Sequence, residues 1–187
     1  MLIRPANLGD VPRLLSLRDE AARWLASKDS DQWARDWPDP ETMVDTIRRS
    51  VATGQTWCVE TDNRVIATIA LDNSVFPGLW TPVELAQPAC YAHRMIVTRD
   101  HTGTGLGAEL LDWAATHTAI AGASWLRVDV WTTNTKLQDY YRRQGFTHVR
   151  TVSHNDYPSG ALFQRAVEVR PTPRLTTPNQ ARHTPSR

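Results

Sequence analysis

The chain has 187 residues, of which 41% are hydrophobic and 22% are charged, and its formal net charge at pH 7 is +1. This balance predicts a globular domain with a full apolar core, and it disfavours nucleic acid or a membrane surface as an electrostatic partner. No apolar run predicts a transmembrane helix or a signal peptide, and the cysteines Cys58 and Cys90 predict free thiols. We therefore expect a cytoplasmic protein.

The first half of the chain predicts helices and strands in alternation. Acidic caps and prolines in the first turn begin two amphipathic helices, and a glycine ends the second. Two β-prone runs flank a short turn and predict an antiparallel hairpin. We expect strands at residues 2–6, 56–60 and 65–71, helices at residues 10–25 and 40–53, and mostly loop at residues 72–90.

The second half continues with strands at residues 92–97, 125–131, 146–152 and 161–167, and with helices at residues 106–120 and 134–144. From Glu168 onward, arginine, proline and threonine dominate, and little of this stretch can bury itself. We expect one folded domain over residues 1–167 and a disordered basic tail over residues 168–187.

A cluster of glycines lies between the strand at residues 92–97 and the helix at residues 106–120. It reads Gly103-Thr104-Gly105-Leu106-Gly107. Glycine permits a tight turn that brings several backbone N–H groups to one point, and the positive end of the helix dipole adds to that point. The arrangement is typical of a loop that binds phosphate.

Two classes of phosphate ligand fit this loop. Gly103, Gly105 and Ala108 match the dinucleotide fingerprint G-x-G-x-x-A, and Asp129 follows about 20 residues later. In that fingerprint the first glycine directly follows the strand, whereas five residues intervene here, and the chain after Asp129 is too short for the further βα units. A nucleotide oxidoreductase is therefore the weakest of the three hypotheses that we consider.

The second class is acetyl-CoA, because the stretch from Met95 to Phe146 resembles the GCN5-related N-acetyltransferase (GNAT) family. Gly105 and Gly107 occupy the two small positions of the family's Gln/Arg-x-x-Gly-x-Gly/Ala pattern, and Gly103 matches a glycine common there. Thr102 stands at the Gln/Arg position and departs from the pattern. Further matches after the next strand are Asn134, Tyr140-Tyr141 and Gly145-Phe146.

The resemblance implies an α/β fold with a mixed, mainly antiparallel sheet of about six to seven strands and helices on both faces. It also implies acetyl-CoA as co-substrate, with no metal. The pyrophosphate would bind at Thr102, Gly103, Thr104, Gly105, Leu106, Gly107 and Ala108. The pantetheine arm would pair with Met95, Ile96 and Val97, where this strand splays from the next one. Asn134 would bind the same arm, cap the following helix, or do both.

The resemblance places the general acid at Tyr141, because the family carries a tyrosine near the coenzyme sulfur on this helix. A phenol can protonate a thiolate leaving group through a short hydrogen bond. The general base stays open among His93, Glu84 and Asp129, and a water relay would need no single base. Tyr140 points about 100° away on a helix, so only one of the two tyrosines can face the sulfur.

The loop at residues 27–39 mixes acidic and aromatic residues. It is either a solvated loop held by its tryptophans or, as in many GNAT enzymes, a lid over the acceptor. Under the second interpretation Trp33, Asp36 and Trp37 would contact a cationic amine.

Together these features predict an N-acetyltransferase that acts on a primary amine of a small molecule or peptide, by direct attack in a ternary complex. The alternative is a non-catalytic GNAT-like module that binds acyl-CoA, and the Thr102 departure favours it slightly. We leave a homodimer open and expect neither a membrane nor a nucleic-acid partner.

Overall fold

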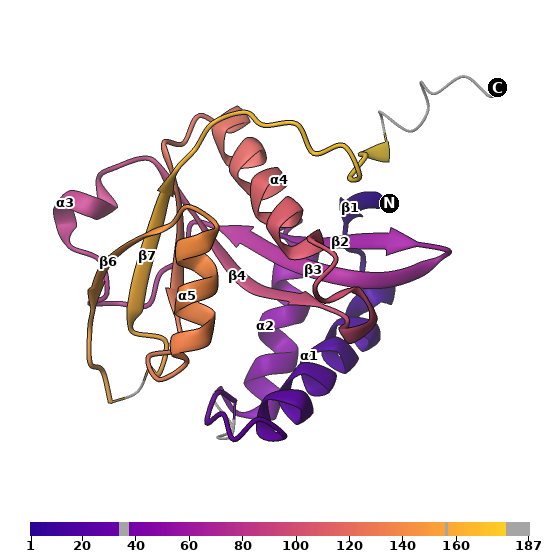
Figure 1. Cartoon of the computed structure of the whole chain (residues 1–187), viewed down its shortest axis with the longest axis horizontal. Helices are drawn as coiled ribbons and strands as arrows, with labels where there is room; N and C mark the ends of the chain where they lie inside the picture. Colours follow the sequence, from indigo (N-terminus) through magenta and orange to yellow (C-terminus); the bar gives the residue numbers. More distant parts are fainter. Residues whose placement is uncertain (34–37, 156, 179–187) are drawn as a thin grey trace.

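The computed structural model describes residues 1–33, 38–155 and 157–178. Seven strands form one sheet in the order β1-β2-β3-β4-β5-β7-β6, and all neighbours are antiparallel except β4 and β5 (Figure 1). This confirms the predicted fold class. The strands are β1 (Leu2–Pro5), β2 (Thr56–Thr61), β3 (Arg64–Asp72), β4 (Ala89–Val97), β5 (Trp125–Val130), β6 (Thr147–Thr151) and β7 (Ala161–Ala166).

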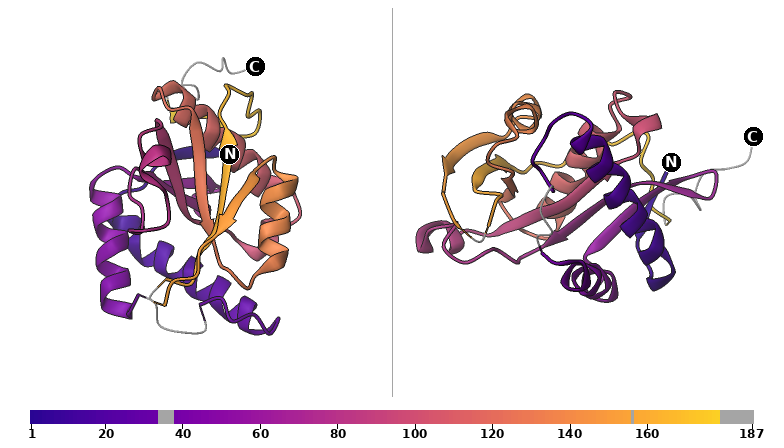
Figure 2. Two further views of the ribbon diagram at one scale, coloured as in Figure 1. Left: turned by 90° about the vertical axis from the view of Figure 1, so that its left-hand side faces the viewer. Right: turned by 90° about the horizontal axis from the view of Figure 1, so that it is seen from below.

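Four main helices cover the two faces of the sheet. Helices α1 (Val11–Ala26) and α2 (Pro40–Ala52) pack together on one face, as Figure 2 shows, and α4 (Leu106–Ile120) and α5 (Thr135–Arg143) pack on the other. Asp39 begins α2 as expected, because its carboxylate accepts a hydrogen bond from the Thr42 N–H at 3.0 Å. Short 3-10 turns precede α1 and α4 at Leu8–Asp10 and Arg99–His101.

The stretch predicted to be mostly loop contains a short helix, α3 (Pro82–Leu85). Thr81 and Glu84 form a reciprocal capping box around it, which satisfies backbone N–H groups that four helical residues alone cannot pair. Strand β4 also begins at Ala89, three residues before the predicted start, because Ala89 to Tyr91 pair with β5.

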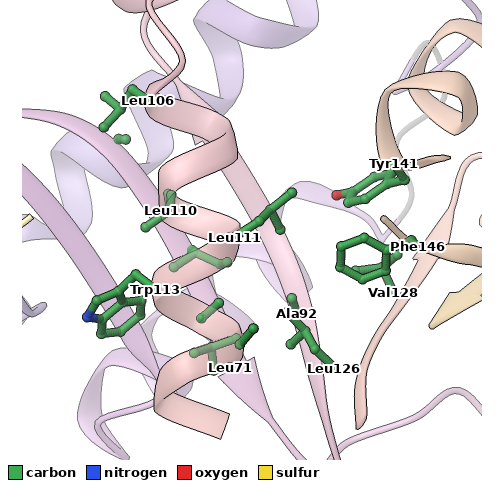
Figure 3. Packing of buried hydrophobic residues seen from close by; sticks show 14 of the residues in the cluster. Leu71, Ala92, Leu106, Leu110, Leu111, Trp113, Leu126, Val128, Tyr141 and Phe146 are labelled. Atoms are coloured by element: carbon green, nitrogen blue, oxygen red, sulfur yellow. The ribbon is translucent and has the colours of Figure 1, made fainter. Parts of the chain in front are cut away.

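The main core lies between the sheet and α4. Leu106, Leu110 and Leu111 are fully buried and recur at the spacing of one helix face (Figure 3). Tyr141 and Phe146 join the same cluster from the side of α5. A second cluster fills the opposite face under α1 and α2. Within the described residues, no helix has the length and apolar character needed to cross a bilayer.

The C-terminal segment begins with an ordered strap, residues 168–178, where we expected disorder. It runs past α4 to the edge of β1 (Figure 1). Leu175 is 3% exposed, and Thr176 exchanges backbone hydrogen bonds with Met1 and Ile3 at 3.1 and 2.9 Å. One buried leucine and a short parallel bridge thus hold a segment whose composition alone indicated no structure. Residues 179–187 lie outside the described part of the chain.

Candidate active site

The glycine loop, residues 102–108, begins α4 with an unusual number of unpaired donors. Gly103 and Gly105 adopt φ of 82° and 84°, which costs a residue with a side chain more than it costs glycine. In the described part of the chain, no acceptor pairs with the backbone N–H groups of Gly103, Gly105, Leu106, Gly107 or Ala108. Five free donors at the positive end of a 15-residue helix form a site that suits a phosphate.

The resemblance implied that both threonines of the glycine loop would bind the pyrophosphate, but their backbone N–H groups are already paired within the chain. The Thr102 N–H donates to the Arg99 carbonyl at 3.1 Å, and its hydroxyl donates to the Thr98 carbonyl at 3.2 Å. Thr104 likewise directs its N–H and its hydroxyl to the His101 carbonyl, at 3.4 and 2.7 Å. Both threonines therefore build the 3-10 turn below the loop, and they leave the free donors to the glycines and to the first helical residues.

A cation reaches the glycine loop from the strap. The Arg174 guanidinium donates to the Thr104 carbonyl at 3.0 Å and pairs with the Glu109 carboxylate, which also accepts from the Arg174 N–H at 2.6 Å. One of its terminal nitrogens lies 3.4 Å from where a Cβ on Gly105 would stand. Arg174 thus brings to this loop the charge that Thr102 lacks.

Strands β4 and β5 part beside the loop. They pair only through Ala89, Cys90 and Tyr91, so β4 has no partner in β5 from Ala92 to Val97. Over the same stretch the register of β4 with β3 shifts between Thr68 and Ala70, and Arg94 adopts φ of 49°. A bulge with a strained residue thus lies where the backbone edge of β4 is open.

The three β4 residues expected to face the coenzyme are divided between the faces of the sheet. Met95 and Val97 pack against the core on the α4 side, whereas Ile96 belongs to the core under α1 and α2. Their backbone groups along the open edge are what could pair with an extended ligand arm.

Tyr141 lies in the core on the side of this opening. It is 8% exposed, and in Figure 3 its hydroxyl points from α5 toward the side of the cluster where α4 lies. Burial, followed by the neighbouring Tyr140 and Asp129, raises the pKa of Tyr141, so the phenol keeps its proton. No described residue forms a hydrogen bond with its hydroxyl. This hydroxyl is the kind of donor that a leaving thiolate requires.

Tyr140 takes a different place on the same helix. Its hydroxyl lies 2.7 Å from where a Cβ on Gly107 would stand, so the small residue at position 107 accommodates this ring. Burial raises the pKa of Tyr140 to about 12. The ring of Tyr140 therefore lies by the glycine loop and the ring of Tyr141 lies in the core, as their angular separation on a helix predicts.

His93 lies among carboxylates on the face that α1 and α2 cover. Its ring nitrogens are 3.2 Å from Asp72 and 3.9 Å from Asp129, and both carboxylates are largely buried. Burial alone would lower the pKa of His93, but the hydrogen bond that its ring donates to Asp72 and the charges of Asp129 and Asp72 outweigh it and raise that pKa. Asp129 also accepts a hydrogen bond from the Tyr157 hydroxyl. Of the predicted bases, His93 and Asp129 thus form one cluster.

Glu84 does not fit the role of a base. Its carboxylate forms an ion pair with Arg150 at 2.7 Å and caps α3 through Thr81. The Arg150 hydrogen bond, against some burial, lowers the pKa of Glu84 to about 2, so the carboxylate is a poor proton acceptor. The ion pair with Arg150 and the cap of α3 give the Glu84 carboxylate a structural role.

Asn134 caps α5 through the Leu137 N–H at 2.9 Å, and its amide also donates to Gln32 at 2.6 Å. Asp31 accepts from the Trp131 indole and the Thr133 hydroxyl at 3.1 and 2.5 Å. The loop after α1 is therefore joined to the end of β5 and the start of α5. Sequence reasoning missed Gln32, because its partner is 102 residues away along the chain.

Trp33 is the only predicted acceptor contact that the described residues include, since Asp36 and Trp37 lie outside them. Trp33 lines a cavity of about 50 Å³ between α1, α2 and the sheet, together with Arg18 and Arg94. Neither arginine was predicted. Arg94 reaches the cavity only through the bulge in β4, and Arg18 reaches it from α1. The described residues include no group of three or more His, Cys, Asp or Glu side chains placed to hold a metal ion.

Comparison with known proteins gives the family. The model of the Acetyltransferase (GNAT) family matches residues 18–146. The uncharacterized N-acetyltransferase YesJ of Bacillus subtilis (strain 168) is 27% identical over 146 residues, which cover 76% of this chain and 79% of that protein. The chain belongs to the GNAT family and is an acyl-CoA-dependent N-acetyltransferase, which confirms the resemblance read from the glycine loop.

Solved structures agree on the fold. A GNAT-family acetyltransferase from Listeria monocytogenes 4b F2365 superposes with a TM-score of 0.68 at 21% identity, over 88% of this chain and 94% of that one. The paia N-acetyltransferase from Thermoplasma acidophilum, solved in complex with coenzyme A, gives a TM-score of 0.67 at 16% identity, over 88% and 97% of the two chains.

Proposed function

We propose that the protein transfers an acetyl group from acetyl-CoA to the primary amine of a small molecule or peptide, by direct attack in a ternary complex. The observation that carries the proposal is the opening of the sheet between β4 and β5 beside a loop with five N–H donors that no described residue pairs. An extended arm with a phosphate at one end and a reactive group at the other fits such a site.

The chain's own groups would hold the coenzyme in three places. The free N–H groups of the glycine loop would bind the pyrophosphate, and Arg174 would add a positive charge beside them. The open edge of β4 would pair with the pantetheine arm, and Asn134, which caps α5, would bind the same arm. A backbone N–H at the Arg94 bulge would polarise the acetyl carbonyl, which is the stabilisation of an oxyanion.

Tyr141 would donate its proton to the departing thiolate. Its raised pKa keeps the hydroxyl protonated, and its lack of a described hydrogen-bond partner leaves the proton free for transfer. Retention of this tyrosine favours an enzyme over a non-catalytic binding module.

His93 would take the proton from the attacking amine, directly or through a water molecule. Asp72 and Asp129 would orient the ring and attract the cationic amine before it loses its proton. A raised pKa makes the imidazole a stronger base, although a smaller fraction of it is neutral at a given pH.

Calorimetric titration with acetyl-CoA, and in parallel with NADH, tests the coenzyme site. We expect micromolar binding of acetyl-CoA alone, and its loss in Gly105→Glu through bulk and charge. Gly122→Glu is a matched control, because Gly105 and Gly122 have φ of 84° and 83° at opposite ends of α4 and so suffer similar backbone strain. Binding of NADH alone, or equal losses in both variants, would contradict the assignment.

A further inference from the structure

The cavity between α1, α2 and the sheet joins apolar walls to two cations. Leu14, Met43, Ile47, Ala70 and Ile96 supply much of the lining, and Arg18 and Arg94 also face it. A water molecule needs about 10–15 Å³ on the same measure, so a cavity of about 50 Å³ has room for a group the size of a carboxylate.

Neither arginine has a close acidic partner among the described residues. Arg94 donates one hydrogen bond, to the Ser50 hydroxyl at 3.0 Å. Arg18 approaches only its neighbour Asp19, at 3.7 Å, and its Nε is buried with no hydrogen-bond partner. Elsewhere in the fold, by contrast, Arg4, Arg150 and Arg165 each pair with a carboxylate at 2.9 Å or less.

Two guanidinium groups at the wall of an apolar cavity are costly without an anion. Burial removes their water, and neither receives from the described residues the close carboxylate that normally compensates for this loss. Burial also lowers the pKa of Arg94, and the charges of Asp72 and Tyr157 offset this effect only in part. An arrangement of this kind is suited to an anionic ligand that arrives from solvent.

The position of the cavity connects it to the proposed chemistry. Arg94 is the bulged residue of β4, so its backbone lies where the acetyl carbonyl would be polarised and its side chain enters the cavity. His93, the preceding residue, lies beside the carboxylates of Asp72 and Asp129, which would attract an amine. One molecule with an amine and an anion a few bonds apart could therefore reach both groups.

We infer that the acceptor is a small primary amine that also carries a carboxylate, and that Arg18 and Arg94 bind this carboxylate while the amine faces His93. The inference rests on the proposed acetyl transfer and names the class of acceptor for it. Amine acetylation then forms an N–C bond, breaks the C–S bond of the thioester, and moves one proton from the amine to the released thiol.

The test compares small amino acids with their own carboxamides as acceptors for the full chain, with acetyl-CoA, by following thiol release. We expect kcat/KM for the acid to exceed that for the amide at least about tenfold, since two charge-assisted contacts are lost. The amine of the amide is less basic and more of it is unprotonated at pH 8, so a preference for the acid cannot come from nucleophilicity.

Variants assign the preference to the two cations. Arg18→Met and Arg94→Met should each lower the ratio of kcat/KM for the acid to kcat/KM for the amide at least about tenfold. Arg23→Met is the matched control, because Arg23 is an exposed arginine on the same helix as Arg18, and it should change neither value. Thermal melts accompany each variant. If Arg94→Met unfolds, Arg18→Met decides the question, because the Arg18 guanidinium forms no hydrogen bond with any residue that the structure describes.

Equal use of acids and amides by the natural protein would overturn the inference while leaving acetyl transfer intact. Equal losses for both acceptors in the variants would also overturn it, because the arginines would then be structural. If no amine is acetylated at all, the proposed function fails instead. In that case calorimetric titration with the amino acids alone still tests the site, and binding that Arg18→Met leaves unchanged would refute it.

Discussion

Replacing Tyr141 with phenylalanine removes one oxygen atom and tests the proposed general acid directly. The Tyr141 hydroxyl has no described hydrogen-bond partner, so its loss costs the fold no intramolecular bond. We expect the free energy of unfolding to change by less than about 0.5 kcal/mol, which corresponds to a Tm change of less than about 2 °C for a chain of this size.

The effect on turnover should be much larger. A positioned general acid contributes about 10²- to 10⁴-fold to a rate, and a thiolate, already a fair leaving group, depends on the acid less than an alkoxide would. We therefore expect kcat to fall about 10- to 1,000-fold, equivalent to about 1.4–4 kcal/mol of lost transition-state stabilisation. The acetyl-CoA Kd should change less than about threefold.

Steady-state thiol release gives kcat, calorimetry gives the coenzyme Kd, and a thermal melt reports stability. Tyr140→Phe is the matched control on the same helix, because the Tyr140 hydroxyl lies by Gly107 and not by the proposed thiolate. If it acts at all, it should change coenzyme affinity and not kcat. A Tyr141→Phe protein that keeps more than about a third of its kcat would refute the role of Tyr141 as the acid.

Two further predictions concern the charges around the site. Arg174→Met should raise the acetyl-CoA Kd about 5- to 10-fold at low salt, with a smaller effect at high salt, because its partly exposed charge lies beside the glycine loop. Arg170→Met lies on the same strap, where Arg170 pairs with Glu168 and Asp112 and not with the glycine loop, so it should leave the Kd unchanged. Equal effects in the two variants would contradict the role of Arg174. His93 must be neutral to act as a base and its pKa is raised above 6.5, so kcat/KM should climb with pH above that value. With an acceptor amine of low pKa, which stays neutral over this range, His93→Gln should abolish this dependence, and an unchanged pH profile would favour a water relay without His93.

Local sequence determined most of the elements and the family. Alternating and 3.6-residue apolar patterns depend only on near neighbours, so α4 was predicted at its observed bounds and the other main elements within a few residues. The glycine loop was equally readable, because positive φ and a strand-to-helix turn are local properties of Gly103 and Gly105. The role of Tyr141 as general acid came from the family resemblance and stays a prediction.

Tertiary structure alone decided which distant groups meet. Composition indicated a disordered tail, yet a few contacts hold residues 168–178 in place and bring Arg174 to Glu109, 65 residues away along the chain. Glu84 looked like a free carboxylate until the fold paired it with Arg150, and His93 acquired Asp72 and Asp129 through sheet order. Pairing between strands is set by register across the whole sheet, which no local pattern encodes.

The cavity between α1, α2 and the sheet illustrates the same limit most clearly. Side chains alternate along an ordinary strand, so the sequence predicts that His93 and Arg94 face opposite ways. One extra residue at the bulge breaks that alternation, and Arg94 enters the cavity that α1 covers. The sequence by itself thus determined the family and the glycine loop, whereas a one-residue shift in register, visible only in the folded sheet, decided which charges line the cavity under α1 and α2.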